Sequence, residues 1–122
     1  RGLGDVYKRQ QSDFAVENMT IVNNAANTTD NADRMQDVIK IRRGAKATIT
    51  NAFVKGSGGT IDLIDMNDSK GAGNAASSIS ITHTLNFKNK LNGTLNTFTE
   101  PTTNTGADAS LFTWSGYNFS SL

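Results

Sequence analysis

The sequence predicts an all-β protein built as a solenoid, in which short strands form successive coils around one axis. Three observations support this prediction. The chain is rich in Asn, Thr, Gly and Ser and holds a single proline, a composition that favours strands and turns over helix interiors. Two segments repeat a strand–asparagine–strand pattern. Two aliphatic runs recur 22 residues apart, a length that suits one coil stacked on the next.

The first ten residues, RGLGDVYKRQ, resemble the translation of a transposase-type sequencing adapter and are set aside as non-native. Residues 11–122 are then expected to be the C-terminal part of a longer reading frame. Without residues 1–10 the chain holds nine basic and ten acidic residues, so the net charge moves from +1 to −1. No basic surface of the kind that binds nucleic acid is indicated. No apolar run approaches the roughly eighteen residues of a membrane-spanning helix.

Asparagine marks a corner in each of the two repeated segments. In residues 16–22 and 49–55 the apolar positions alternate up to the asparagine and restart at the next residue, which a flat strand of period two does not allow. Asn18 and Asn51 tolerate the left-handed conformation that turns such a corner. We therefore expect these two side chains to lie one above the other, with their amides hydrogen-bonded along the stack.

The two aliphatic runs predict where the core lies. Ile39 and Ile41 of the first run correspond to Ile61 and Leu63 of the second, 22 residues further on. We expect all four side chains to be buried and the two strands to be parallel and adjacent. A β-sandwich is the competing fold, and it would pair such strands in antiparallel fashion, with turns every 8–12 residues or so.

The remaining elements complete a cycle of strands and loops. The polar loop 24–37 and the insertion 67–78 are expected to project from the solenoid and to be its most mobile parts. His83 is expected to replace asparagine at a third, degenerate corner. The expected strands are 13–17, 19–23, 38–43, 47–50, 52–55, 60–65 and 79–85.

An aromatic cluster lies near the end of the sequence. The end of a solenoid exposes unpaired strand edges and an open core, so we expect the cluster to form a C-terminal aromatic cap. Trp114 would then be buried against Leu85 or Phe87. The alternative is that the aromatic rings stand on an open surface and stack on sugars. The cluster comprises Phe112, Trp114, Tyr117 and Phe119.

This layout resembles a right-handed parallel β-helix, the solenoid of pectate-lyase-like surface proteins. In that family, three strands per coil are joined by one tight corner, often asparagine, and by two variable loops. The resemblance covers residues 13–88. Residues 39–50, 61–71 and 111–119 also look similar to the C-terminal ends of surface β-helix proteins of Bacteroidetes-type bacteria. The implied organisation is a non-native segment (1–10), β-helix coils (11–90) and a C-terminal tail with its cap (91–122).

Four charged residues on two neighbouring strands are the candidate ligand-binding residues. Lys40 and Arg42 belong to one strand, and Asp62 and Asp65 to the next. The resemblance implies such a role, because pectate-lyase-like enzymes act on acidic polysaccharides with arginine and calcium-bound aspartates along a strand. The alternative is a stack of cross-strand charge pairs on a solvated face.

Neither a metal site nor a catalytic residue is predicted. The segment DMNDSKG, residues 65–71, superficially resembles a calcium loop, but Lys70 stands where such a loop needs glycine and Ala76 where it needs a bidentate carboxylate. Weak Ca²⁺ binding through Asp65, Asn67 and Asp68 stays open, and no other cofactor is expected. His83 is the single histidine, and its sequence neighbours include no carboxylate that would orient it as a general base.

Together with the resemblance, these features predict a non-catalytic C-terminal part of a bacterial extracellular or cell-surface β-helix protein. It would be a monomer that presents loops for polysaccharide or surface interaction. The alternative is the terminal coils of a β-helix carbohydrate-active enzyme, a polysaccharide lyase or glycoside hydrolase whose site lies mostly upstream. An adhesin or phage tail-spike stalk would need an apolar outer stripe, which the segment lacks.

Overall fold

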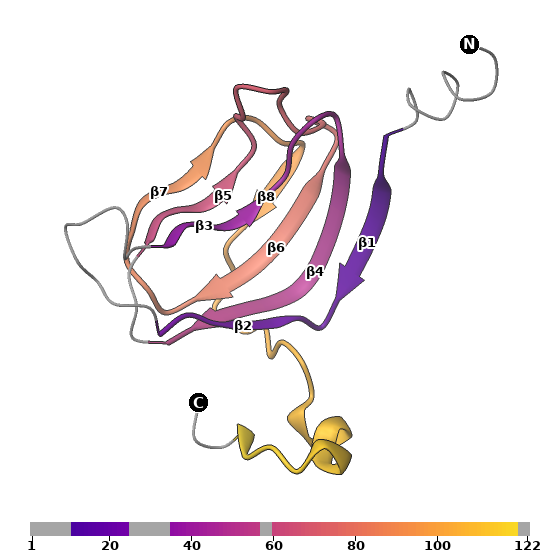
Figure 1. The fold of residues 1–122 in the computed structure, drawn as a ribbon, viewed down its shortest axis with the longest axis vertical. Coiled ribbons are helices and arrows are strands. Elements are labelled where there is room, and N and C mark those ends of the chain that lie inside the picture. The colour runs from indigo at the N-terminus through magenta and orange to yellow at the C-terminus, as the bar shows by residue number, and fades with distance from the viewer. Residues whose placement is uncertain (1–10, 25–34, 57–59, 120–122) are drawn as a thin grey trace.

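The computed structural model describes residues 11–24, 35–56 and 60–119 (Figure 1). Residues 1–10, which the sequence indicates are non-native, and most of the loop predicted at 24–37 lie outside the described residues. In chain order the elements are β1 (Asp13–Glu17), β2 (Thr20–Val22), β3 (Met35–Lys40), β4 (Lys46–Lys55), β5 (Thr60–Asp65), β6 (Ser78–His83), β7 (Phe87–Asn92), β8 (Thr97–Thr99) and the 3₁₀ helix η1 (Ala109–Ser115).

All pairings between these named strands are parallel. One sheet has the order β1-β4-β6-β8, and β2 also pairs with β4. The other sheet has the order β3-β5-β7. The two sheets face each other across the core (Figure 1). The described chain is therefore all-β with two parallel sheets, and the parallel pairing of β3 with β5 excludes the antiparallel arrangement of a β-sandwich.

The core lies between the sheets and draws on the alternating side chains of β4 and β6. Ala47 and Ile49 are buried before the corner in β4, and Ala52 and Val54 are buried after it. The inward positions thus restart after Asn51, as the pattern predicts. Burial of these aliphatic side chains removes apolar surface from water and is the main stabilising contribution that the two sheets share.

The predicted pairing of the two aliphatic runs is correct in direction but wrong in register. Ile41 and Leu63 are buried, and Ile39 is half-buried against the core, whereas the side chain of Ile61 lies outside the described part. Ile39 pairs with Ile64, 25 positions further on, instead of with Ile61. Leu63 and Ile64 are both fully buried. The alternation of apolar and polar residues therefore does not identify the inward face of β5. The 22-residue spacing inferred from that alternation gives the wrong register.

The two asparagine corners are confirmed. Asn18 and Asn51 have left-handed backbones, with φ of 58° and 52°. The Nδ2 amide of Asn51 donates to Oδ1 of Asn18 at 2.9 Å, and the backbone N–H of Asn18 donates to the Thr50 carbonyl at 3.1 Å. A side-chain bond between stacked corners satisfies polar groups at a point where the strand ladder bends.

The prediction of a third corner at His83 is wrong. His83 pairs with Val54, three residues beyond the corner asparagine of β4. The register shifts between Ile49, which pairs with Ile79, and Ala52, which pairs with Ile81. Two residues of β4 therefore lie opposite one residue of β6, Ser80, which is the arrangement of a β-bulge. The bulge absorbs the corner without a second left-handed residue in β6.

The insertion 67–78 is hydrogen-bonded to the body of the protein, and most of its residues are exposed. Its backbone carbonyls at Gly71 and Ala72 accept from the N–H groups of Arg43 and Gly44, at 2.7 and 2.8 Å. Ser77 is fully buried, and its Oγ accepts from the N–H of Ala47 at 3.0 Å. The turn after β3 leaves the N–H groups of Arg43 and Gly44 without partners of its own, and the carbonyls of the insertion satisfy them.

A C-terminal strap, residues 101–108, crosses the strands of the first sheet. The hydroxyl of Thr82, in β6, donates to the Pro101 carbonyl at 2.6 Å. The N–H of Thr105 donates to Oδ1 of Asn51, in β4, at 2.8 Å. The N–H of Ala107 donates to the hydroxyl of Thr20, in β2, at 2.8 Å. The strap therefore carries the chain from β6 back across β4 to β2.

The predicted aromatic cap is wrong. No residue of η1 is buried, and Trp114 is 82% exposed instead of lying against Leu85 or Phe87. Leu85 is buried without it, and Phe87 contacts the His83 ring edge-on at 5.3 Å. The reason is the direction of the strap, because the chain reaches η1 beside β2 (Figure 1), away from β6 and β7.

Candidate functional site

A ladder of polar side chains crosses the second sheet and includes three of the four predicted site residues. The strand register places Asp37, Asp62 and Asn89 in one row and Lys40, Asp65 and Asn92 in the next. We call these six residues the polar ladder. It arises because β3, β5 and β7 each carry polar residues three positions apart, at Asp37 and Lys40, Asp62 and Asp65, and Asn89 and Asn92.

Short contacts hold the polar ladder together. Lys40 Nζ lies 3.1 Å from Asp65 Oδ2 and 3.5 Å from Asp37 Oδ2. The Asn89 amide donates to Asp62 Oδ1 at 2.8 Å. The Asn92 amide lies 3.5 Å from Asp62 Oδ2 and 3.2 Å from Asp65 Oδ1, so it joins the two rows. Asp62 and Asp65 are buried, at 5% and 6% exposure.

Arg42 stands apart from the ladder. Its Nη1 lies 3.5 Å from Asp68 Oδ2, which is an ion-pair contact without hydrogen-bond geometry, and its side chain is 51% exposed. Lys40 also reaches Asp68 Oδ1, at 3.9 Å. Within the described residues, the structure thus brings Lys40, Asp62 and Asp65 together and connects Arg42 to them through Asp68.

The carboxyl groups of the ladder differ in how easily they ionise. Burial and the charge of Asp65 raise the pKa of Asp37. Burial also opposes ionisation of Asp65, but the backbone N–H of Asn67, together with Lys40 and Asn92, outweighs it and lowers the Asp65 pKa. The hydrogen bond to Asp65 raises the pKa of Lys40. The Lys40 ammonium with three neighbouring carboxylates is the dominant electrostatic feature here.

The ladder also determines what a cation would meet. Asp37, Asp62 and Asp65 each place one oxygen within 4.8 Å of the others, and hard cations such as Ca²⁺ prefer oxygen ligands of this kind. The Lys40 ammonium already supplies positive charge at this point. In the segment that resembles a calcium loop, Asp65 Oδ1 accepts from the Asn67 N–H at 3.0 Å, as in a local turn.

His83 lies in a second charged cluster that the sequence did not predict. Its Nε2 is hydrogen-bonded to Glu100 Oε2 at 2.8 Å, and Lys90 Nζ lies 3.1 Å from the same oxygen. The hydrogen bond to His83 is the main reason why the pKa of Glu100 is lowered. The other ring nitrogen, Nδ1, is buried without a hydrogen-bond partner in the described part of the chain. This cluster joins β6 and β7 to Glu100, the residue before the strap.

The aromatic segment, residues 109–119, forms an exposed apolar surface beside β2. The side chain of Asp108 begins η1 by accepting from the N–H of Ser110 at 3.0 Å, and Gly116 ends it with φ of 72°. Phe119 packs against Phe112 and Tyr117, with ring centroids 6.0 and 4.9 Å apart. The large hydrophobic residues that it leaves exposed are Leu111 (68%), Phe112 (40%), Trp114 (82%) and Tyr117 (56%).

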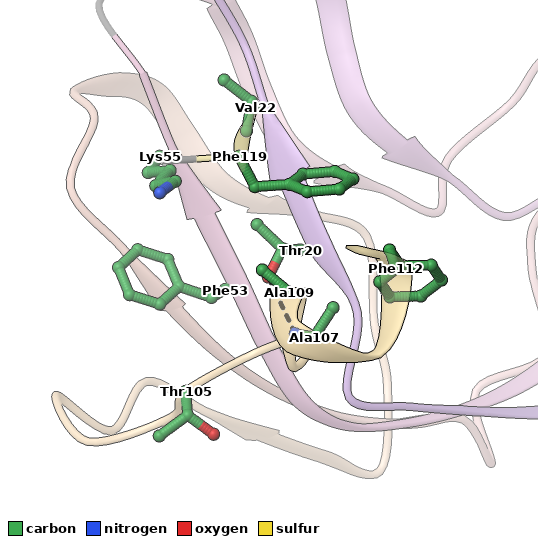
Figure 2. Close-up of a pocket in the computed structure, with 9 residues that line it drawn as sticks. All are labelled: Thr20, Val22, Phe53, Lys55, Thr105, Ala107, Ala109, Phe112 and Phe119. Carbon is green, nitrogen blue, oxygen red and sulfur yellow. Dashed lines mark hydrogen bonds between the residues drawn. The ribbon is translucent and has the colours of Figure 1, made fainter. Parts of the chain in front are cut away.

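An apolar groove of about 380 Å³ lies between the aromatic segment, the strap and the first sheet. Figure 2 shows Phe53 and Lys55 of β4 on one side and Phe112 and Phe119 on the other, with the Thr20–Ala107 bond between them. Sequence analysis missed this groove because the strap that forms it has no apolar periodicity. The groove is lined by Thr20, Val22, Phe53, Lys55, Thr105, Ala107, Ala109, Phe112 and Phe119.

No protein-family model, curated protein or solved structure significantly matches this chain. Among the described residues, no helix is long and apolar enough to cross a membrane.

Proposed function

We propose that this chain is a non-catalytic, polysaccharide-binding part of a bacterial extracellular or cell-surface protein with a right-handed parallel β-helix fold. Two features support the fold. The pairings between the named strands are parallel in both sheets, and two left-handed asparagines stack at one corner with a hydrogen bond between them. Stacked coils of this kind bury a core between neighbours and leave loops and termini for binding.

One observation supports polysaccharide binding most strongly: the aromatic segment is exposed. A tryptophan that is 82% exposed contributes little to folding, and Tyr117 and Phe112 stand exposed on the same segment. An exposed apolar patch on a soluble protein usually marks an interaction surface. Aromatic rings with a polar edge suit a sugar, which presents C–H groups on its faces and hydroxyls at its rim.

The polar ladder supports a structural role for the residues that sequence analysis nominated. Lys40, Asp62 and Asp65 already satisfy one another and the two asparagines of β7. A ligand would have to displace those contacts, whereas the aromatic segment offers its rings without displacement. The proposed binding surface is therefore the aromatic segment, and the ladder holds the second sheet together.

A glycan array probed with the chain tests this function. Wild type is expected to bind at least one class of polysaccharide, and Trp114→Ala is expected to abolish binding while leaving the melting temperature unchanged. Phe14→Ala is the matched control, because Phe14 is also an exposed aromatic residue (41%) but lies on β1. Absence of any glycan binding, or equal binding by Trp114→Ala, would show that the proposal is wrong.

A second candidate function is glycoside hydrolysis at the polar ladder. Its support is the pair Asp37 and Asp65, whose pKa values are shifted in opposite directions. Such a divergence separates a general acid from a carboxylate nucleophile or base. Release of reducing ends from polysaccharides by wild type, and its loss in Asp37→Asn, would establish this function in place of the first. The non-catalytic proposal predicts no release by either protein.

A further inference from the structure

The apolar groove has a composition that restricts its ligand. Its nine lining residues include three phenylalanines, a valine and two alanines, so most of the wall is apolar. Its volume of about 380 Å³ falls within the usual range of small-molecule sites, roughly 300–1,000 Å³. A ligand that fills it must present a flexible or flat apolar body.

The charge on the wall has one sign. Lys55 is the one charged side chain among the nine lining residues, and no carboxylate is among them. An ammonium has three N–H donors, so Lys55 is able to bind an anionic group in addition to the interaction that it already makes within the chain. Complementarity therefore favours a ligand with a single negative charge at one end.

The groove is built from segments that lie far apart in the sequence. Thr20 and Val22 come from β2, Phe53 and Lys55 from β4, and the remaining residues from the strap and the aromatic segment. The bond from the Ala107 N–H to the Thr20 hydroxyl fixes the strap against β2 at the floor of the groove (Figure 2). The apolar groove is thus formed by hydrogen-bonded segments of the fold, and the exposed rings of Trp114 and Tyr117 do not line it.

We propose that the apolar groove binds a single-chain amphiphile with an anionic head group, such as a fatty-acid carboxylate. The alkyl chain lies between Phe53 on one side and Phe112 and Phe119 on the other, and the carboxylate is held by Lys55. The ligand binds as a monomer, because the strap and the aromatic segment enclose the groove from two sides. This site shares Phe112 with the proposed polysaccharide-binding surface but not Trp114 or Tyr117, and it does not rest on the proposed function.

Isothermal titration calorimetry with octanoate, decanoate and dodecanoate, each below its critical micelle concentration, tests the proposal. Affinity is expected to rise about fourfold for each added methylene, the value for full burial of a methylene group. Dodecyltrimethylammonium, with the same tail and the opposite charge, is expected to bind at least about tenfold more weakly, because it lacks the charge-assisted bond. Equal affinity for the two head groups, or no dependence on chain length, overturns the proposal.

Variants separate the two parts of the site. Lys55→Gln is expected to remove the preference for the carboxylate and to keep the dependence on chain length, whereas Lys88→Gln, at an exposed lysine of β7, changes neither. Phe112→Ser is expected to weaken dodecanoate binding, and it decides the matter if Lys55→Gln fails to fold. Phe112 is 40% exposed, so its loss spares the core.

Two further measurements distinguish a monomeric amphiphile from a membrane surface and from a glycan. Flotation with vesicles of phosphatidylglycerol, combined with no binding of monomeric dodecanoate, would mean a membrane surface as the partner and overturn the proposal. Trp114→Ala is expected to bind dodecanoate like wild type, even though it loses glycan binding. A negative glycan array would therefore count against polysaccharide binding alone. A negative dodecanoate titration would count against the groove site alone.

Discussion

Asn51 connects both asparagine corners to the strap, so its replacement tests how these parts depend on one another. Its Nδ2 donates to Asn18 Oδ1 at 2.9 Å, and its Oδ1 accepts from the Thr105 N–H at 2.8 Å. Its backbone is left-handed, with φ of 52°. Asn51→Ala removes both bonds and places a Cβ-bearing residue without local side-chain support in that conformation.

The expected size of the effect follows from these contacts. Each lost hydrogen bond contributes about 1 kcal/mol. Alanine in the left-handed conformation adds roughly 1–2 kcal/mol, which glycine avoids. We expect Asn51→Ala to lower the free energy of unfolding by about 3 kcal/mol and Asn51→Gly by about 2 kcal/mol, out of the roughly 5–15 kcal/mol of a typical domain.

Urea unfolding followed by circular dichroism measures both variants. The order is the sharper part of the prediction, because both variants lose the same hydrogen bonds and differ in the backbone cost. If Asn51→Gly is as unstable as Asn51→Ala, the left-handed corner does not contribute as described. If both variants unfold within about 0.5 kcal/mol of wild type, as an ordinary surface substitution does, the corner stack is not a stabilising element.

Four more predictions concern the strap, the ladder and the aromatic segment. Gly106→Ala should destabilise the protein by roughly 1–3 kcal/mol in urea unfolding, because an added Cβ would clash with the Thr20 hydroxyl and φ is +71°. Wild-type stability of this variant would mean that the strap does not pack on β2. Asp65 has a lowered pKa, so its stabilising effect is present above its ordinary value of 3.8 and is lost as the pH falls through the lowered value. Asp65→Asn should therefore lower the melting temperature at pH 7 and change it little in strong acid. Asp37 has a raised pKa, so its ionised form opposes folding, and Asp37→Asn should raise the melting temperature at pH 7. Trp114→Ala should leave the melting temperature unchanged because the ring is exposed. A drop of several degrees would instead indicate that Trp114 packs against the end of the core as a cap.

Local backbone chemistry explains which parts of the fold could be predicted from the sequence. A break in the period of two at Asn18 and Asn51 has few physical causes, and a left-handed asparagine is the simplest of them. The corners and the buried positions of β4 followed from it. The register of β5 could not be predicted in the same way, because Asp62–Met66 are all buried and alternation carries no information there.

The misplaced elements depend on contacts between residues far apart in the sequence. The bulge at Thr50 and Asn51 replaces a third corner, and no residue near His83 signals it. The strap is held by bonds such as Thr105 to Asn51 and Ala107 to Thr20, and these decide that the aromatic segment lies beside β2. Of the candidate site, the grouping of Lys40 with Asp62 and Asp65 could be predicted from neighbouring strands, whereas the groove could not.

Parallel stacking of the strands in a defined register is the central structural claim, and disulfide formation tests it most directly. The chain has no cysteine, so each engineered pair is unambiguous. Asp13 pairs with Lys46, and Glu17 with Thr50, at the two ends of the β1–β4 pairing. Cysteines at either pair should form a disulfide under mild oxidation, as read by mass spectrometry of the intact protein. The pair Asp13→Cys with Thr50→Cys should not, because four residues of strand separate the two positions by about 13 Å. A disulfide in that pair, with none in the first two, would show an antiparallel arrangement and contradict the account.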